Sequence, residues 1–171
     1  MKRSHFIKSL LGGTLCAATV FMAAPGDAQA LPDPSDPRVV TLRVQIQTGN
    51  DDLRSQSQAV ARLDYTTPDG NHRDTSAGLN NGSSWSNWSS HTVDIGMPGD
   101  VYLSRLDELS IEFTSGQSGP FDTGDNWNMQ SITVTAILDD EEASQVILIQ
   151  DAGTPLHRFK SDNNTVWTET F

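Results

Sequence analysis

Residues 40–47 read Val-Thr-Leu-Arg-Val-Gln-Ile-Gln, with an apolar residue at every second position. Successive side chains of an extended strand point to opposite faces, so this period of two predicts a strand with one buried and one solvated face. Residues 59–65 repeat the pattern, with Ala59, Ala61, Leu63 and Tyr65 on the buried face. Their strand ends at Thr-Pro-Asp-Gly, residues 67–70, where proline and Asp-Gly favour a turn.

More short segments of the same kind follow, separated by connections rich in Gly, Asn and Ser. An all-β fold is therefore expected, either an antiparallel two-sheet sandwich of about eight strands or a barrel. A single helical turn is expected at Leu103 to Leu109. The further strands are predicted at residues 92–96, 109–113, 131–138 and 145–150, with weaker candidates at 72–76, 155–160 and 165–171.

The first 30 residues have the features of a signal peptide. Met1-Lys2-Arg3 and Lys8 precede an apolar run from Leu10 to Ala24, and Ala28-Gln29-Ala30 forms a small-residue cleavage site. The run of about fifteen residues is shorter than the roughly 20 needed to cross a bilayer. We therefore expect a secreted or periplasmic protein whose mature form has no transmembrane segment. The one cysteine, Cys16, lies inside this leader.

Residues 31–37 form a proline-rich linker, because prolines at positions 32, 34 and 37 exclude a helix or a central strand. Residues 38–171 then make a single domain. Cleavage after residue 30 would leave 171 − 30 = 141 residues with 8 basic and 21 acidic side chains, a net charge of 8 − 21 = −13. Such a surface disfavours nucleic-acid binding. This negative charge either keeps the protein soluble, or part of it is clustered to hold a cation.

No catalytic residues are predicted. The histidines of the mature chain, His72, His91 and His157, are far apart, and no Gly-x-Ser-x-Gly nucleophile motif is present. The acidic run 139–142 is typical of a solvated hairpin turn rather than of a cleft. A non-enzymatic function is therefore expected.

Two loops place oxygen-bearing side chains at short spacing, residues 48–54 and 121–128. Calcium prefers six to eight hard oxygen ligands of this kind, so Asp51, Asp52, Asp125 and Asn126 are the candidate metal ligands. The alternative is that these Asp and Asn residues serve only to form tight turns.

The order of these motifs resembles the PLAT domain of lipoxygenases, polycystins and clostridial alpha-toxin. The resemblance runs from Val40 to Phe159 and rests on four stretches. They are Thr48-Gly49 with its acidic loop, Asn80-Asn81-Gly82 followed by Trp85, the segment His91-Thr92-Val93-Asp94-Ile95, and residues 125–134, Asp-Asn-Trp-Asn-Met-Gln-Ser-Ile-Thr-Val.

The resemblance implies an eight-stranded antiparallel sandwich that attaches to lipid or protein surfaces, often with calcium in loops at one end. Asp125 matches a ligand position of the alpha-toxin branch. The family's calcium aspartate falls at Gln58, so Asp51 and Asp52 would have to substitute for it. At the second site only Asn80 and Gly82 remain, which makes Asn80 a candidate ligand contact.

Three tryptophans carry distinct expectations. Trp127 precedes an alternating strand and is expected in the core, and Trp85 matches a buried aromatic of the family. Trp88 either covers the open end of the sandwich or inserts into a membrane interface or stacks on a sugar ring. Trp88 is therefore the second candidate ligand contact.

Three classes of function follow from these observations. The leading one is a secreted, non-catalytic module that attaches to lipid, protein or glycan through its end loops, with calcium as a candidate cofactor. The second is a structural, envelope-associated protein without a small ligand. The third is a hydrolase that uses Asp51, Asp52 or Asp125, which would need two carboxylates facing one cleft.

Overall fold

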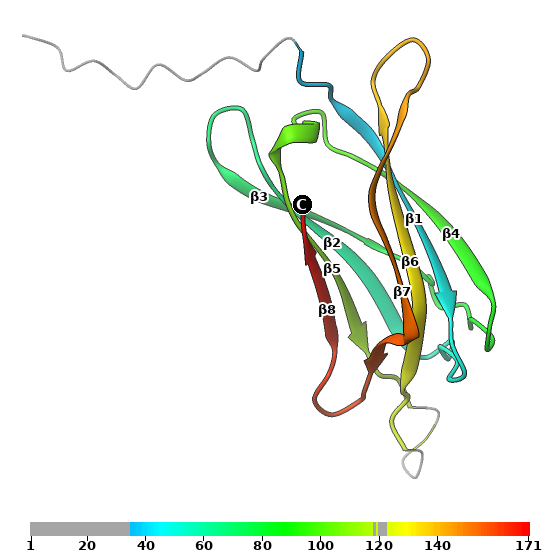
Figure 1. The fold of residues 1–171 in the computed structure, drawn as a ribbon. Helices are drawn as coiled ribbons and strands as arrows, with labels where there is room; N and C mark the ends of the chain where they lie inside the picture. Colours follow the sequence, from blue (N-terminus) through cyan, green and yellow to red (C-terminus); the bar gives the residue numbers. More distant parts are fainter. Residues whose placement is uncertain (1–34, 118, 120–122) are drawn as a thin grey trace, which may run out of the picture.

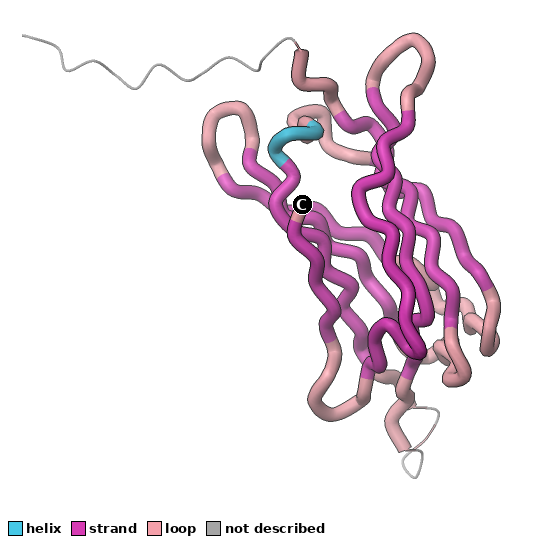
Figure 2. Tube along the Cα trace, in the orientation of Figure 1, coloured by secondary structure: helices cyan, strands magenta, loops and turns pink. Residues whose placement is uncertain are grey.

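The computed structural model describes residues 35–117, 119 and 123–171, which form eight strands and one short 3-10 turn (Figures 1 and 2). The predicted signal peptide and residues 31–34 of the predicted linker lie outside this part. The strands are β1 (Val39–Thr48), β2 (Gln58–Thr66), β3 (His72–Gly78), β4 (Ser90–Gly96), β5 (Leu106–Thr114), β6 (Trp127–Leu138), β7 (Gln145–Phe159) and β8 (Val166–Thr170).

The strands form two four-stranded sheets, in the orders β4-β1-β6-β7 and β3-β2-β5-β8. Every pairing between neighbouring strands is antiparallel. The two sheets face each other across a shared core, so the prediction of a two-sheet sandwich is confirmed and the barrel is not what forms (Figure 1).

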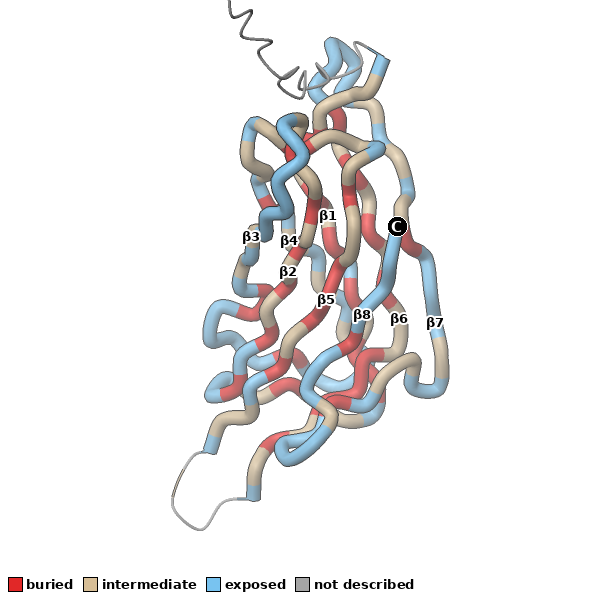
Figure 3. Tube along the Cα trace, turned by 90° about the vertical axis from the view of Figure 1, so that its left-hand side faces the viewer, coloured by how far each residue is buried: buried red, intermediate tan, exposed pale blue. Residues whose placement is uncertain are grey.

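The alternation in the sequence places the core as expected. Leu42, Val44 and Ile46 of β1 are each 1% exposed, and the four predicted inward residues of β2 are equally buried. Figure 3 shows the resulting alternation of buried and more exposed positions along β2. Burial of apolar surface at about 25 cal/mol per Å² is the main force that holds such sheets together.

β7 differs from the prediction, which treated residues 145–150 and 155–160 as separate strands. It runs without a break through Gly153, Thr154 and Pro155. Proline is tolerated here because β7 is an edge strand, where a missing amide need not interrupt a ladder. The pairing with β6 shifts register between Met129 and Ser131, which accommodates the irregular segment.

The helical turn expected at residues 103–109 is limited to the 3-10 turn η1 (Leu103–Arg105), after which β5 begins. Two residues of the predicted linker bind to this turn. The Asp36 carboxylate accepts hydrogen bonds from the backbone amide and the hydroxyl of Ser104, at 3.0 and 2.6 Å. The amide of Leu103 donates to the carbonyl of Pro37 at 3.0 Å.

Because adjacent strands run in opposite directions, the connections gather at two ends of the sandwich. The lower end, at the bottom of Figure 1, carries the loops at residues 49–57, 79–89 and 160–165 and the described residues 115–117 and 123–126 of the connection between β5 and β6. The upper end carries the connections at residues 67–71, 97–105 and 139–144. Both loops that the sequence singled out for calcium belong to the lower end.

Candidate functional site

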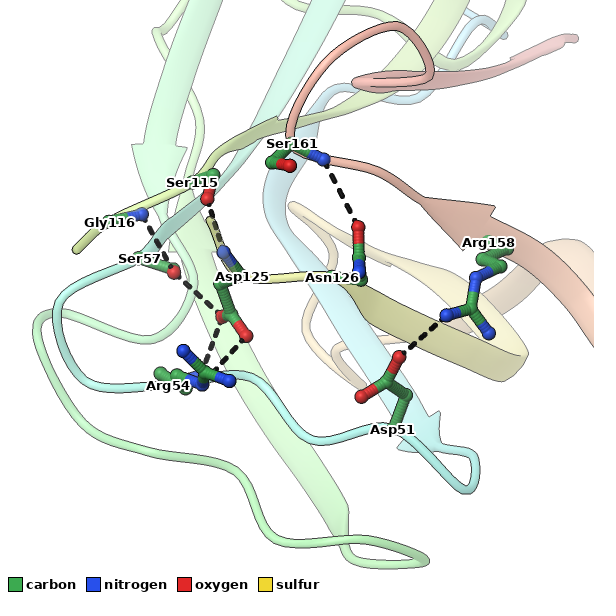
Figure 4. Close-up of polar contacts among 9 residues, drawn as sticks. All are labelled: Asp51, Arg54, Ser57, Ser115, Gly116, Asp125, Asn126, Arg158 and Ser161. Carbon is green, nitrogen blue, oxygen red and sulfur yellow. Dashed lines mark hydrogen bonds and ion pairs between the residues drawn. The ribbon is translucent and has the colours of Figure 1, made fainter. Parts of the chain in front are cut away.

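The lower end brings the two acidic loops together, as Figure 4 shows for Asp51, Asp125 and Asn126. The amide of Asn128 donates to the carbonyl of Asp51 at 3.2 Å, and the amide of Gly49 donates to the carbonyl of Asn128 at 2.7 Å. These backbone bonds connect the loop after β1 to the start of β6. Residues about 75 positions apart in the sequence therefore share one end of the fold.

Asp125 is the buried centre of this end, with 1% of its surface exposed. Its Oδ2 accepts hydrogen bonds from the Arg54 amide at 3.0 Å and from the Ser57 hydroxyl at 2.7 Å. The Arg54 guanidinium lies 3.2 Å from Oδ1. A buried carboxylate is stable only when paired and hydrogen-bonded in this way.

The same group extends to the end of β5. The amide of Gly116 donates to the Ser57 hydroxyl at 3.0 Å, and the amide of Asp125 donates to the Ser115 hydroxyl at 2.6 Å. We call this set the Asp125 network: Arg54, Ser57, Ser115, Gly116 and Asp125 (Figure 4). It joins three segments of the chain through contacts among its own members.

Asp51 lies nearer the surface and forms an ion pair with Arg158, with Oδ2 and Nη2 3.0 Å apart. Burial raises the pKa of the Asp51 carboxyl, and the negative charges of Asp125 and Asp52 raise that pKa further. The positive charges of Arg158 and Arg54 oppose this rise. The pKa of Asp51 is therefore raised overall, because burial and the neighbouring carboxylates outweigh the effect of the two arginines.

The two remaining candidate ligands are placed differently. Asn126 accepts a hydrogen bond at its Oδ1 from the amide of Ser161, at 3.2 Å, and so helps to hold the connection between β7 and β8. Asp52 follows Asp51 in the chain and is partly exposed.

The four side chains do not present one common set of free oxygens to a calcium ion. The Asp125 carboxylate is enclosed by its network, and the Asn126 oxygen is occupied by Ser161. Among the described residues, no three His, Cys, Asp or Glu side chains lie together in a way that could hold a metal. Of the four candidate ligands, Asp51 and Asp52 are the two whose carboxylates lie nearest the surface of this end, and calcium binding there stays a prediction.

Asn80, the first candidate ligand contact, is buried and bonded to the protein itself. Its Oδ1 accepts from the amide of Ala59 at 3.1 Å, and its Nδ2 donates to the carbonyls of Ser57 and Ser83 at 2.9 and 3.1 Å. The side chain fixes the loop after β3 against the start of β2. Its amide is satisfied within the fold, so it is a positioning residue for the loop.

Trp88, the second candidate, is 59% exposed and lies on the loop that leads into β4. Its backbone has φ of 61°, in the left-handed region, and its amide donates to the carbonyl of Gly49 at 3.0 Å. A bulky residue is a genuine outlier at such an angle. The loop therefore holds an aromatic side chain out in solvent at the lower end.

The other two tryptophans behave as the sequence predicts. Trp127 is fully buried and stacks on Phe159, with ring centroids 4.7 Å apart. Trp85 is 3% exposed, meets Trp127 edge to face at 5.8 Å, and stacks on His91 at 4.3 Å. These aromatic contacts close the core beneath the lower end.

A second charged region, which the sequence reasoning missed, lies on the sheet β3-β2-β5-β8. A hollow of about 470 Å³ is lined by side chains of β2, β3 and the start of β5, with both signs of charge present. Arg62 lies 3.4 Å from both Asp64 and Asp74, so the single guanidinium compensates only part of the negative charge of these two carboxylates. The side chains lining the hollow are Arg62, Asp64, His72, Arg73, Asp74, Asp107 and Glu108.

Arg54, Ser57 and Arg158 are the partners that sequence reasoning did not find. Arg54 meets Asp125 across 71 residues, and Arg158 meets Asp51 across 107. No local pattern marks such pairs. The sequence offered one signal for these arginines, which is that only eight basic residues follow residue 30. An arginine close to an acidic loop is then a reasonable candidate for an ion pair with it.

In the part of the chain that the structure describes, no helix has the length and apolar character needed to cross a bilayer.

The fold and its lower end define a class: an antiparallel sandwich of two four-stranded sheets whose acidic and aromatic loops meet at one end, as the PLAT resemblance implies. No family model and no curated protein sequence matches the chain. Among solved structures, the alpha toxin of Clostridium absonum aligns with a TM-score of 0.52 and 14% identity, over 78% of this chain and 32% of the toxin.

The alpha-toxin of Clostridium perfringens from an avian strain aligns equally well, with a TM-score of 0.52 and 14% identity over 84% of this chain and 33% of the toxin. The chain therefore spans about a third of the length of these toxins. This likeness confirms the PLAT-like sandwich fold. At such low identity it speaks for the fold alone.

Proposed function

We propose that this protein is an exported, non-catalytic module that attaches to a lipid surface through its lower end. The PLAT-like fold supports a surface-binding role, and the position of Trp88 carries the proposal. A tryptophan that is 59% exposed on a left-handed backbone gains little packing that would offset the strain. Its amphipathic ring suits the interface between headgroups and acyl chains.

The distribution of charge favours the lower end as the contact. The acidic residues of the upper-end connections would repel anionic headgroups. They are Asp69, Asp100, Asp139, Asp140, Glu141 and Glu142. Arg38 and Arg73 offset two of them, Asp139 and Asp100. At the lower end, described basic residues also offset part of the negative charge; these are Arg54, Arg158 and Lys160. Attachment by the lower end keeps the more acidic end away from the membrane.

The test uses tryptophan fluorescence with phosphatidylcholine vesicles. The other three tryptophans are buried, so a spectral change on binding reports Trp88. We expect a blue shift and quenching by brominated acyl chains. Vesicle co-sedimentation, which does not need the Trp88 signal, should show Trp88→Ala losing about tenfold or more in partitioning, since burial of its exposed surface is worth about 2 kcal/mol or more. Trp167→Phe, which alters a buried ring, is the matched control.

Two results would count against the proposal. No association of the wild-type protein with vesicles of any composition, or equal binding by wild type and Trp88→Ala, would remove Trp88 as the membrane contact. If glycans rather than vesicles bind in a Trp88-dependent way, the lower end is a sugar-binding end, and the lipid proposal fails.

Calcium binding stays a prediction, now reduced to Asp51 and Asp52. Anionic vesicles containing phosphatidylserine should repel the acidic protein, and we expect millimolar calcium to restore binding. Calcium should also raise the melting temperature by linkage. The double variant Asp51→Asn/Asp52→Asn should lose both effects while keeping its attachment to phosphatidylcholine. A calorimetric titration without heat or thermal shift in the wild type would reject calcium, and the lipid proposal would stand.

A further inference from the structure

The outer face of the sheet β4-β1-β6-β7 is almost free of charge. This neutral face consists of residues 41, 43, 45 and 47 of β1 together with their register partners on β4, β6 and β7. One row, for example, reads Thr92, Gln45, Thr133, Gln150 across the four strands. Within the face only Arg43 and Asp94 are charged, and they form a bidentate ion pair. Nε and Nη2 of Arg43 donate to Oδ1 and Oδ2 of Asp94 at 2.7 and 2.8 Å.

The neutral face stands out because the full chain has a net charge of −11. On the other sheet, the corresponding outward positions 60, 62 and 64 of β2 and their register partners include four carboxylates against Arg62. Those carboxylates belong to Asp64, Asp74, Glu108 and Glu112. The excess negative charge of this protein is therefore carried elsewhere than on the neutral face.

The neutral face also carries apolar surface. Ile147 of β7 is 60% exposed and pairs with Thr135, and Ile137 of β6 lies on the same face and is partly exposed. The remaining positions are mostly threonine, serine and glutamine, which can exchange hydrogen bonds with a similar surface. The apolar part lies toward the β7 edge of the face, beside uncharged polar residues, and such a combination resembles a weak protein interface.

We infer that the neutral face is the contact through which two copies of this chain associate. Two copies with a charge of −11 repel each other over most of their surface, and like charges forced together cost several kcal/mol of specificity. This face allows close approach without burying uncompensated carboxylates. The occupant is therefore a second copy, packed face to face about a twofold axis.

The dimensions of the face set the strength of the association. Strands about 4.8 Å apart and rows about 6.7 Å apart give four strands by four rows an area of about 500 Å². Two copies would bury about 1,000 Å², at the lower limit of specific interfaces. We therefore expect a reversible dimer that forms at concentrations on the order of 100 µM.

Sedimentation velocity of the purified protein from about 5 µM to 1 mM tests the inference. The average mass should rise toward that of a dimer, and Ile147→Glu should raise the dissociation constant at least about tenfold. Val166→Glu is the matched control, because Val166 is 45% exposed on the outer face of β8, an edge strand of the other sheet. The control variant should dimerise like the wild type.

The salt dependence of dimerisation is a second, independent test. The Debye length falls from about 30 Å at 0.01 M to about 3 Å at 1 M salt, so added NaCl should strengthen a contact that works against net repulsion. A monomer at all concentrations and salt levels would overturn the inference. Equal weakening by Ile147→Glu and Val166→Glu would also overturn it. None of these outcomes bears on vesicle binding, which uses the lower end.

Discussion

At the scale of single residues, Trp88 is the position where the local backbone and the side chain conflict most clearly. A left-handed conformation suits glycine and costs other residues roughly 1 to 2 kcal/mol. Backbone strain of this kind tends to persist where the side chain has a use. Trp88 therefore links the conformation of one loop to the proposed attachment of the whole protein.

Replacing Trp88 by glycine should separate stability from binding. We expect Trp88→Gly to increase the free energy of unfolding by about 1 kcal/mol, because the left-handed backbone is no longer strained. Trp88→Ala keeps the strain and should stay within about 0.5 kcal/mol of the wild type. Both variants should bind vesicles weakly. Urea unfolding measures the stabilities, and a large loss in either variant would place Trp88 in the core.

Asp125 should behave in the opposite way. Asp125→Asn removes the charge that Arg54 and Ser57 surround, so we expect a loss of about 2 to 4 kcal/mol in urea unfolding. Asp51→Asn, the comparison variant, touches a partly exposed ion pair and should change stability by less than about 1 kcal/mol. Similar effects of the two substitutions would show that the Asp125 network does not stabilise the lower end.

At the scale of elements, the ends of β4 and β7 make the lower end sensitive to acid. Burial lowers the pKa of His91, which stacks on Trp85, and of His157, which packs against Phe159. The unfolded chain, with histidine pKa values near about 6.5, then takes up protons before the folded one does. Stability is thus complete above about pH 7 and falls as the pH drops below about 6.5.

Urea unfolding between about pH 7.5 and 5 measures this loss. The variant His91→Gln/His157→Gln should show a flatter profile over the same interval, because neither side chain titrates there. Aspartates whose pKa is lowered in the folded protein, such as Asp94 beside Arg43, reduce the stability of the fold only below about pH 4. An unchanged slope in the double variant would mean that other groups cause the acid sensitivity.

The sequence predicted the central strands well and the edges less well, for a physical reason. β1 and β2 alternate strictly because their neighbours on both sides and the facing sheet leave one face buried. β3 and β8 lie at edges and have few buried residues, so their patterns are weak. In β7, Pro155 reads as a break, although an edge strand tolerates it.

At the scale of the whole molecule, the sandwich follows from patterns within each strand, whereas the contacts of the lower end do not. Period two and turn residues are local, so they identify strands without reference to the rest of the chain. The pairing of Asp125 with Arg54 depends on how three loops meet after folding. The sequence therefore located both acidic loops at one end through the family resemblance, but not the arginines that neutralise them.

The Asp125 network also determines how that end comes apart. The amides of Arg54, Gly116 and Asp125 itself all donate into this one group, from three different segments. Separation of any one segment breaks hydrogen bonds of this group, and separation of residues 54–57 from Asp125 leaves a buried carboxylate without these partners. The three should therefore open as one cooperative unit, and their amide protons should exchange with deuterium at a shared rate.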